Sequence, residues 1–450
     1  MDIFGNINSK MLGIKFDITP YELYKKLSLS YDYTFLLESV SGPKELVESS
    51  IIGFDPSKMI KVYSNKIVLN YKDKKNKIIL TDKPFIVIKN LIPKSTKKTY
   101  RYFGGAVGII NYDAIGIWEK SLKNKNKNIL MEFGIYEDGI IYDKKNKKLN
   151  YFYLKNNRFE KLKNLEKHHF NKCKISKLKT NINAKNFNKI LTVAKQHIAI
   201  GDIFQIVLSR KINFDVEGDA LKIYDELRKI NPSPYLYYLK MKNKIIIGSS
   251  PEMLLRITNN VIETFPIAGT RKISKNKSKN DKLKNELQKN EKEVAEHTML
   301  VDLGRNDLGK ICKYGTIKVK DFMKIKQYSH VQHMITHIIG KLKKEYDMFD
   351  AFQSVFPAGT VSGAPKIRAI QIIDKLEKNK RGPYAGAVGY FSSNGNCDFA
   401  ISIRSIFINN NKGFIQTGAG ILLDSKFQNE FKELNYKAAA MLTALKLASR

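Results

Sequence analysis

The chain has 450 residues, of which 79 are Lys or Arg and 43 are Asp or Glu, so its formal net charge at pH 7 is +36. Because 43% of the residues are hydrophobic and 11% aromatic, the chain can bury a substantial interior, which excludes an intrinsically disordered protein. Its length indicates two to three compact units or one large interleaved domain. No apolar run is long enough to cross a bilayer, and the start MDIFGNINSK does not resemble a secretory leader, so we expect a cytoplasmic protein.

The cysteine spacing and the lysine distribution argue against two further classes of protein. Cys173, Cys312 and Cys397 show no CxxC spacing, so neither a zinc site nor a disulfide framework is expected. The lysines fall mostly in Lys/Asn stretches such as residues 120–127 and 143–148, which lack the interleaved aromatic residues of a base-stacking surface. A non-catalytic, basic nucleic-acid-binding protein is therefore kept only as the alternative from another class.

Short apolar runs separated by turns dominate the chain up to about residue 155. They predict strands of a predominantly antiparallel sheet at residues 51–53, 66–69, 85–88, 104–110 and 139–142. A polar, lysine-rich segment at residues 155–182 follows and is the best candidate for a boundary. We therefore predict an N-terminal region at residues 1–155 and a second region at residues 183–450.

Helices and strands are mixed in the second region. Residues 186–200 have helical spacing and end at Gly201, a typical stop before a strand. Further strands are predicted at residues 235–241, 244–248, 253–257, 385–391, 399–408 and 414–417, and helices at residues 279–303, 332–338, 364–376 and 428–447. The order lacks the regular alternation of a doubly wound sheet and shows no repeat. The predicted class is α+β, with packed antiparallel sheets flanked by helices.

The strand that follows Gly201 carries a glutamine at its centre, in the run GDIFQIVLSR (201–210). Burying the amide of Gln205 is unfavourable unless its polar atoms find partners. An amide at a sheet surface and an amide with a role in a site both fit this observation, so the strand alone leaves both interpretations open.

Two predicted helices each carry a pair of glutamates three residues apart. Glu293 and Glu296 lie in EKEVAEH, and Glu430 and Glu433 lie in NEFKEL. Residues i and i+3 share a helix face, so each pair can present two carboxylates to one point. Four converging carboxylates would repel one another unless a hard dication such as Mg²⁺ lay among them. One such pair by itself is more typical of a solvated helix face.

Two glycine-rich segments and one arginine point to an anionic ligand. PAGTVSGAPK (357–366) and TGAG (417–420) are predicted as turns whose backbone N–H groups can approach an anion, although ordinary tight turns have the same pattern. Arg404 lies in an otherwise apolar strand predicted at residues 400–406, which indicates a buried ion pair or a bound carboxylate. The charged run at residues 297–308 would be costly to bury without partners.

Nine motifs, in order, resemble the signatures of the chorismate-utilising enzymes, most closely those of the anthranilate synthase component I group. They are GDIFQIVLSR, NPSPYLYYL (231–239), GSSPEML (248–254), ETFPIAGTR (263–271), EKEVAEHTMLVDLGRNDLG (291–309), YSHVQH (328–333), FPAGTVSGAPKIRA (356–369), RGPYAGAVGYF (381–391) and TGAGILLDS (417–425). The resemblance extends to nearly the whole chain through LLES (36–39), IIGFDP (51–56) and FGGAVGIINYD (103–113).

The resemblance implies a Mg²⁺-dependent lyase of tryptophan biosynthesis. Such an enzyme aminates chorismate at ring C2 with loss of the C4 hydroxyl, and then eliminates pyruvate to leave anthranilate. The family's metal ligands fall on Glu293, Glu296, Glu430 and Glu433. Its carboxylate-binding groups fall on Tyr384, Arg404, Lys437 and the backbone of Gly418, Ala419 and Gly420, with Thr360 from the first glycine-rich segment. Its catalytic acid, which protonates the departing hydroxyl, falls on Glu252, and the histidine associated with pyruvate elimination falls on His333.

Two positions distinguish the reactions within this family. Isochorismate and salicylate synthases carry a lysine that activates water where this chain has Gln205, and a neutral amide cannot act as that base. Aminodeoxychorismate synthases typically carry a lysine where this chain has Ala268. Both positions indicate ammonia as the nucleophile and anthranilate as the product. An aminodeoxychorismate synthase component I of the folate pathway is the alternative within the family.

The resemblance also implies two further partners. The family takes ammonia from a glutamine amidotransferase, and because no cysteine of this chain lies in a GxCxG-like elbow, that amidotransferase is expected to be a separate subunit. The family's tryptophan feedback site falls on Glu38, Ser39, Asn231, Pro232, Ser233, Pro234, Tyr235 and Leu236. Two residues depart from the family pattern: Leu236 replaces a frequent methionine of the feedback site, and Tyr436 replaces the usual asparagine beside Lys437.

Overall fold

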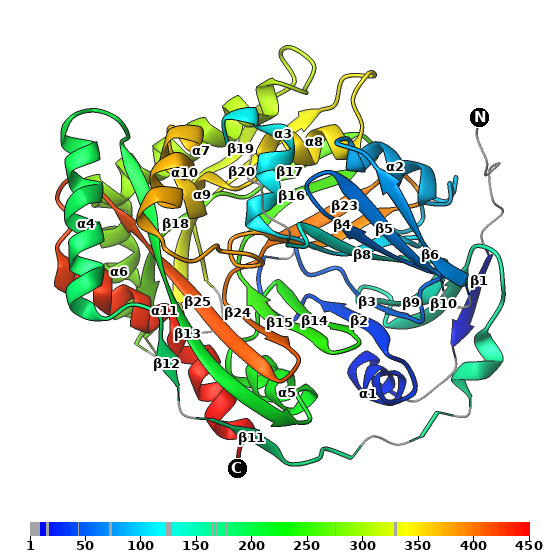
Figure 1. The fold of residues 1–450 in the computed structure, drawn as a ribbon. Helices are drawn as coiled ribbons and strands as arrows, with labels where there is room; N and C mark the ends of the chain where they lie inside the picture. The colour runs from blue at the N-terminus through cyan, green and yellow to red at the C-terminus, as the bar shows by residue number, and fades with distance from the viewer. Residues whose placement is uncertain are drawn as a thin grey trace.

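Two large antiparallel sheets form the body of the protein (Figure 1). The structure, a computed structural model, describes residues 10–14, 18–43, 45–71, 74–122, 128–163, 165–166, 169–176, 178–274, 276–327 and 331–450. Residues 328–330 of the YSHVQH motif therefore lie outside the described residues. Over the described ranges one sheet has 13 strands and the other has 12. Both sheets are flanked by helices, which confirms the α+β class.

The first sheet carries the GDIFQIVLSR strand near one edge and N-terminal strands near the other. In spatial order its strands are β1 (Lys10–Ile14), β10 (Lys148–Tyr153), β9 (Asp138–Asp143), β3 (Ser49–Phe54), β2 (Tyr33–Glu38), β14 (Tyr235–Met241), β15 (Lys244–Ser250), β24 (Ser405–Asn409), β25 (Lys412–Ile421), β13 (Gln205–Gly218) and β11 (Cys173–Ile175), with β12 (Lys179–Thr180) and β21 (Gly363–Ala364) also paired to β13.

The second sheet likewise mixes early and late strands. In spatial order they are β18 (Ile267–Lys272), β20 (Val331–Lys341), β17 (Val261–Thr264), β16 (Met253–Thr258), β23 (Cys397–Ile401), β22 (Ala387–Ser392), β7 (Gly105–Ile110), β8 (Met131–Tyr136), β4 (Lys58–Val62), β5 (Lys66–Tyr71) and β6 (Lys74–Leu80), with β19 (Lys318–Gln327) paired to β20. Strands from before and after residues 155–182 thus pair directly, β2 with β14 and β7 with β22. The division at residues 155–182 stays a prediction.

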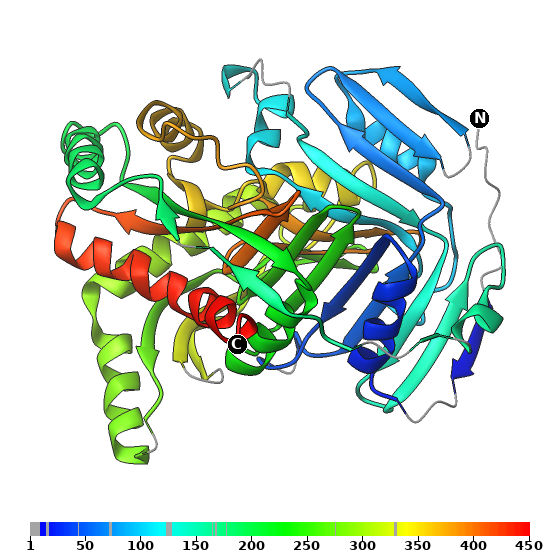
Figure 2. The ribbon, with the colours of Figure 1, turned by 60° about the horizontal axis from the view of Figure 1, so that its bottom comes forward.

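Helices cover the outer faces of the two sheets. They are α1 (Pro20–Ser30), α2 (Pro84–Leu91), α3 (Ile115–Trp118), α4 (Ala184–Ala199), α5 (Leu221–Ile230), α6 (Lys277–Lys289), α7 (Glu291–Gly309), α8 (Met348–Val355), α9 (Gly359–Ser362), α10 (Lys366–Leu376) and α11 (Phe427–Ala448), with 3-10 turns at Tyr112–Ala114, Lys120–Leu122 and Phe159–Leu162. Helices α4, α10 and α11 pack on β13 and β25, while α7 packs on β18 and β20 (Figures 1 and 2). In the described part of the chain no helix is long and apolar enough to span a membrane.

In two segments the prediction is wrong, because a predicted strand is a helix and a predicted helix is a strand. Residues 85–88 were expected as a strand but lie in α2, where Pro84 occupies the first helical position and Ile86 is 56% exposed between buried Phe85 and Ile88. Residues 332–338 were expected as a helix but lie in β20, which pairs with β17 and β18 on one side and β19 on the other. Both runs are short and apolar, and in such runs the hydrophobic period does not separate a helix from a strand covered on both faces.

Three other predicted elements differ in their ends. The helix expected at residues 279–303 is two helices, because the Asn290 side chain accepts a hydrogen bond from the Glu293 N–H at 3.0 Å and so begins α7. The strand expected at residues 399–408 is interrupted between β23 and β24, where Arg404 has a left-handed φ of 52°. Residues 417–420 were expected as a turn but lie inside β25.

An aromatic cluster around Phe391 of β22 lies between the second sheet and helices α2 and α8. Phe391 is fully buried, and its ring lies within 5.9 Å, centre to centre, of the rings of Phe85, Phe133, Phe349, Phe352 and Phe399. These rings come from both ends of the chain, so this cluster helps to hold early strands and late strands in one body.

We expect Phe391→Ala to lower the free energy of unfolding by about 3–5 kcal/mol, because it removes a large side chain from a close-packed interior and leaves a cavity. Urea denaturation measures this change. The exposed ring of Phe322 on β19 provides the control, since Phe322→Ala removes the same atoms from a site that is 54% exposed. Equal losses in the two variants would contradict the assignment of the aromatic core.

Candidate active site

Gln205 is the first residue of β13 and its amide is directed toward helix α7. The side chain is only 4% exposed, and its Nε2 donates a hydrogen bond to Glu296 Oε1 at 2.9 Å. Gly420 on the neighbouring strand β25 leaves room for it, because a Cβ on Gly420 would lie 2.8 Å from the Gln205 Nε2. Gln205 is therefore not an amide at a sheet surface. It is bound to one of the four glutamates that the sequence singles out.

The four glutamates lie near the starts of α7 and α11, and these two helices bring them within electrostatic range of one another. Burial raises the pKa of Glu296; the Gln205 amide lowers it, and the nearby charges of Glu293 and Glu433 raise it again. Burial likewise raises the pKa of Glu430, and the charge of Glu433 adds to that rise. The charges of the two pairs therefore act on one another, while their joint role as metal ligands stays a prediction.

Two of these carboxylates have cationic partners. Arg271 Nη1 donates to Glu293 Oε1 at 3.0 Å, and Lys437 Nζ lies 2.5 Å from Glu433 Oε1. Over the described residues no three carboxylate, imidazole or thiolate groups are drawn together closely enough to hold a metal ion. Glu296 is half-buried and Glu430 buried, each with only neutral hydrogen-bonding partners and a raised pKa, and a hard dication would offset the unfavourable burial of their charges. The chemistry of the donor set therefore fits Mg²⁺.

The groups predicted to bind carboxylates lie beside this acidic site. Lys437 Nζ donates to the carbonyl oxygen of Gly418 at 2.9 Å, and Arg404 Nη1 donates to the carbonyl oxygen of Lys437 at 3.2 Å. The Tyr384 hydroxyl faces Gly418, since a Cβ there would lie 2.5 Å from it. Among the described carboxylates none forms an ion pair with Arg404, and its burial lowers its pKa. Of the two interpretations of this arginine, the ligand carboxylate is therefore favoured.

Glu252, the predicted catalytic acid, has a raised pKa. Its burial raises its pKa to about 8, against which the Thr360 hydroxyl and the charge of Lys437 act in the opposite direction. At neutral pH the carboxyl group therefore carries its proton. A pocket between α7 and α9 is lined by Glu252 and Thr360.

His333 is buried on β20 and is neutral. Its Nδ1 lies 3.2 Å from the Gly269 carbonyl oxygen and 2.9 Å from the Thr270 hydroxyl. Because a carbonyl oxygen only accepts, we assign the imidazole proton to Nδ1, which leaves Nε2 free of a proton. Burial lowers the pKa of His333 to about 4, and the positive charge of nearby Arg404 contributes.

A buried ion pair that sequence reasoning missed holds these elements together. Arg381 is 2% exposed and binds both carboxylate oxygens of Glu377, at 2.9 and 2.8 Å. The same guanidinium donates to the carbonyl oxygens of Val361 at 2.7 Å and Val207 at 2.6 Å, while Glu377 Oε1 accepts from the Ser209 N–H at 2.7 Å. The guanidinium also lies 5.7 Å from the centre of the Tyr384 ring. The sequence does contain a hint of this pair, since Glu377 and Arg381 lie four residues apart directly after the helix predicted at residues 364–376.

The charged run after Glu296 is mostly solvated rather than buried. Asp302 and Arg305 form an exposed pair at 3.1 Å, while Asp307 is buried and bound by Lys366 at 2.7 Å. The desolvation cost expected from the sequence applies to Asp307, where an ion pair offsets it, and to fully buried His297, whose pKa burial lowers to about 4.

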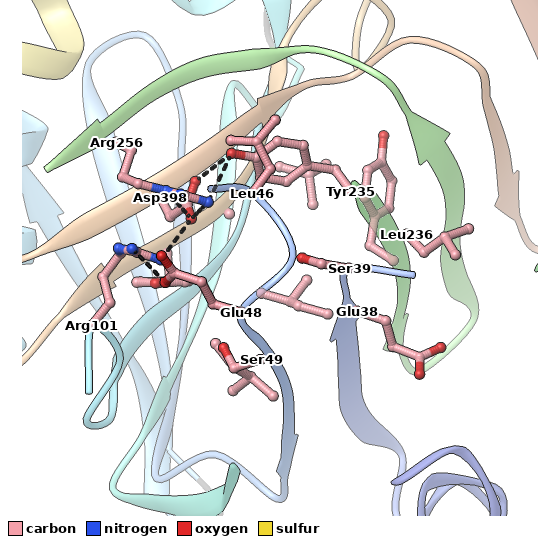
Figure 3. A pocket seen from close by; sticks show the side chains of 16 residues that line it. Glu38, Ser39, Leu46, Glu48, Ser49, Arg101, Tyr235, Leu236, Arg256 and Asp398 are labelled. Carbon is pink, nitrogen blue, oxygen red and sulfur yellow. Dashed lines mark hydrogen bonds and ion pairs between the residues drawn. The ribbon is translucent and has the colours of Figure 1, made fainter. Parts of the chain in front are cut away.

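A separate pocket contains part of the predicted feedback site (Figure 3). Of the eight residues assigned to that site, Glu38, Ser39, Tyr235 and Leu236 line the pocket. Asn231, Pro232, Ser233 and Pro234 do not line it, although the Ser233 carbonyl accepts from the Val40 N–H at 3.0 Å. The Glu38 carboxylate is directed away from the other labelled polar groups in Figure 3 and is bound by Tyr224 and Arg228, each at 2.8 Å.

The same pocket has a charged wall that sequence reasoning missed. Arg101 binds Glu48 at 2.7 Å, and Arg256 binds Asp398 at 2.9 Å (Figure 3). These four residues come from segments far apart in the sequence, so no local pattern could have grouped them.

Comparison with known proteins places the chain in a family. It matches the model of the chorismate binding enzymes over residues 32–443, and it therefore belongs to that family. The anthranilate synthase component 1 of Methanothermobacter thermautotrophicus is 42% identical over 431 residues, 95% of this chain and 92% of that protein. The component 1 of Saccharolobus solfataricus is 40% identical over 439 residues, 95% and 97% of the two chains.

Solved structures agree with this placement. The anthranilate synthase component I of Streptococcus pneumoniae has a TM-score of 0.77 at 32% identity, covering 88% of this chain and 92% of that one. The menaquinone-specific isochorismate synthase of Escherichia coli, with a TM-score of 0.75 at 17% identity, shares the fold. The resemblance seen in the motifs is thus confirmed over nearly the whole chain, which is a chorismate-utilising enzyme of the kind that its component I relatives represent.

We expect Arg381→Met to lower the free energy of unfolding by about 3–5 kcal/mol, because it leaves the Glu377 charge buried without its partner. The double variant Arg381→Met with Glu377→Leu is expected to lose less than the sum of the two single variants. A urea double-mutant cycle measures this coupling, and Arg305→Met, at the exposed pair, serves as the control with little change expected. Additive losses would show that the pair is not one unit.

Proposed function

We propose that this chain is the large subunit of an anthranilate synthase, which aminates chorismate and eliminates pyruvate to give anthranilate, the first step of tryptophan biosynthesis. The observation that carries the proposal is the position of Gln205. This neutral amide is bound to Glu296 and stands where the isochorismate and salicylate synthases carry the lysine that activates water. The component 1 relatives at about 40% identity support the same conclusion. Ala268 on β18 disfavours the aminodeoxychorismate alternative.

The four glutamates of α7 and α11 would hold Mg²⁺, and Arg271 and Lys437 would have to release Glu293 and Glu433 when it binds. When bound, the ion supplies a positive charge that orients an anionic substrate. Tyr384, Arg404 and Lys437 are proposed to bind substrate carboxylates. Arg404 supports this best, because its half-buried guanidinium makes one hydrogen bond to a backbone carbonyl and keeps further N–H donors, from which a carboxylate can accept two parallel hydrogen bonds.

The proton transfers are proposed to run through Glu252 and His333. As ammonia bonds to C2 and the ring double bonds shift, the C4 hydroxyl takes the Glu252 proton and leaves as water. The added amine then releases a proton, which restores the Glu252 acid. In the second step the C2 proton passes to the proton-free Nε2 of His333, the proposed acceptor, while the C3–O bond breaks and the ring becomes aromatic. The enolpyruvate that leaves takes up a proton at its methylene carbon and becomes pyruvate. Gln205 donates a hydrogen bond to Glu296, and because its amide is neutral it cannot act as the base that would activate water.

Two partners complete the proposal. Ammonia is supplied by a separate glutamine amidotransferase subunit, as the naming of the relatives as component 1 suggests. L-tryptophan is proposed to inhibit the enzyme from the pocket of Figure 3, whose paired Arg and acidic side chains suit an amino acid's carboxylate and ammonium groups. We propose that the enzyme works in the cytoplasm.

The proposal is tested by supplying the purified protein with chorismate, Mg²⁺ and an ammonium salt, and by following anthranilate fluorescence. We expect anthranilate to form, its formation to stop when the metal is chelated, and its rate of formation to decrease when tryptophan is added.

Glu293→Gln is expected to lower the rate of anthranilate formation at least a hundredfold, because it removes a charged ligand. Glu291→Gln, on the exposed side of the same helical turn, is the matched control. Chorismate left unchanged by the unmodified protein would refute the proposal.

The pH dependence of kcat tests the role of Glu252. The carboxyl group has a pKa of about 8, so the acid form needed to protonate the hydroxyl is present below that pH and is lost above it. With ammonia held at a constant concentration of the unprotonated form, kcat is expected to fall by about tenfold per pH unit above pH 8. Glu252→Gln is expected to remove both the activity and this limb of the profile. A flat profile up to pH 10 would assign the acid elsewhere.

A further inference from the structure

Arg210, the last residue of the GDIFQIVLSR segment, is an arginine buried without a carboxylate. The residue is 5% exposed, and among the described residues no carboxylate forms an ion pair with it. Its Nε is buried and has no hydrogen-bond acceptor in the described part of the chain. Burial of a guanidinium without an opposite charge is unfavourable, so stability alone does not explain an arginine at this position.

The Arg210 guanidinium contacts one side of helix α11. Its Nη2 donates to Asn435 Oδ1 at 2.6 Å, and its central carbon lies 4.8 Å from the centre of the Phe431 ring. Phe431 and Asn435 are four residues apart and therefore lie on the same side of the helix. A planar guanidinium can lie over a ring and donate from its edge at the same time, which suits these two contacts better than the compact ammonium group of a lysine.

The turn of α11 that Arg210 contacts also carries a predicted metal ligand. Glu433 is two residues from each contact point, so with about 3.6 residues per turn it points to the opposite side of the helix. Thr417 of β25, which pairs with Arg210 across the ladder, donates from its hydroxyl to the Leu434 carbonyl oxygen at 3.1 Å. Two paired residues of β13 and β25 therefore fix the rotation of α11 about its own axis.

Strand β13 is bonded to both helices that carry the predicted metal ligands. Gln205, five residues before Arg210 on the same strand, donates to Glu296 of α7 at 2.9 Å. The strand pairs with β25 from Ile206 to Asp215, and α11 runs beside β25 (Figure 2). Helices α7 and α11 are thus each positioned by a side chain of one strand, α7 through Gln205 and α11 through Arg210.

We propose that Arg210 is a positioning residue of the predicted metal site, which fixes the rotation of α11 and so directs Glu430 and Glu433 toward the glutamates of α7. The inference rests on the proposed function and adds to it a residue that supports the ligands. Its guanidinium contacts α11 on the side away from Glu433, so its effect on a metal ion passes through the helix. Removal of a residue that orients metal ligands typically costs about 10–100-fold in metal affinity.

Calorimetric titration of the purified protein with MgCl₂ tests the proposal. Arg210→Met keeps an unbranched side chain and removes the guanidinium, and we expect the dissociation constant for Mg²⁺ to rise about 10–100-fold. In the anthranilate assay the Mg²⁺ concentration that gives half the maximal rate is expected to rise in parallel. The kcat at saturating Mg²⁺ is expected to change less, because excess ion fills the weakened site. Arg210→Lys, which keeps the charge and loses the planar fork, is expected to have an intermediate Mg²⁺ dissociation constant.

Asn435→Ala tests the same contact in a variant that is expected to fold normally. Asn435 is exposed on α11, and alanine favours a helix at such a position. We expect this variant to raise the Mg²⁺ dissociation constant, although by less than Arg210→Met, because the contact with Phe431 remains. The double variant Arg210→Met, Asn435→Ala is expected to bind Mg²⁺ as Arg210→Met does, since both changes remove one shared hydrogen bond.

The matched control is Arg158→Met. The Arg158 guanidinium also lies 4.8 Å from the centre of a phenylalanine ring, that of Phe54, and it binds buried Asp138 at 2.8 Å among the N-terminal strands. This variant is expected to lower the free energy of unfolding and to leave the Mg²⁺ dissociation constant unchanged.

The proposal and the function on which it rests fail on different results. An unchanged Mg²⁺ dissociation constant in folded Arg210→Met, or an equal rise in Arg158→Met, would overturn the positioning role. So would an unmodified protein that binds no Mg²⁺. If the unmodified protein binds Mg²⁺ but makes no anthranilate, the proposed function fails, whereas the titration still decides the role of Arg210.

Discussion

The contact between Arg381 and Glu377 is the interaction on which the rest of the site depends. One guanidinium binds a carboxylate on both oxygens and two backbone carbonyls, and the carboxylate in turn binds a backbone N–H. These partners belong to β13, α9 and the end of α10, and the ring of Tyr384 lies beside them. In a low-dielectric interior such a network is rigid when all of its members are satisfied. The segments that carry Gln205, Thr360 and Tyr384 are thereby fixed relative to one another before any ligand arrives.

Around this satisfied network lie groups that are not satisfied within the protein. Arg404 is half-buried and forms no ion pair with any carboxylate of the described residues, Glu252 keeps a proton because of its burial, and Glu296 and Glu430 have only neutral hydrogen-bonding partners. Strongly perturbed ionisable groups in one place are typical of a functional site, because the ligand supplies the missing charges. The site thus combines a rigid, fully paired frame with ionisable groups that lack charged partners.

The sequence alone identified the residues that break a local pattern, and it missed those that only tertiary pairing brings together. The glutamate pairs, Arg404 and Gln205 could be recognised because each breaks a local rule, a charge or an amide in an apolar or helical pattern. The feedback residues Asn231 to Pro234 do not line the pocket, while Arg101 and Asp398 do, because tertiary pairing between distant strands decides a pocket wall. The exchange of helix and strand at residues 85–88 and 332–338 has a similar origin: short apolar runs carry no period, and their neighbours in space select the conformation.

Because each sheet combines early and late strands of the chain, neither sheet can be completed until late in synthesis. As the ribosome releases the first 155 residues, β7 has its neighbour β8 but must wait for β22, and β2 has β3 but must wait for β14. Until residue 387 emerges, the edge of β7 carries unpaired backbone groups, which are templates for pairing with other chains. Such distant pairings are also slow to form. The half-synthesised chain therefore presents sheet edges that the finished protein covers.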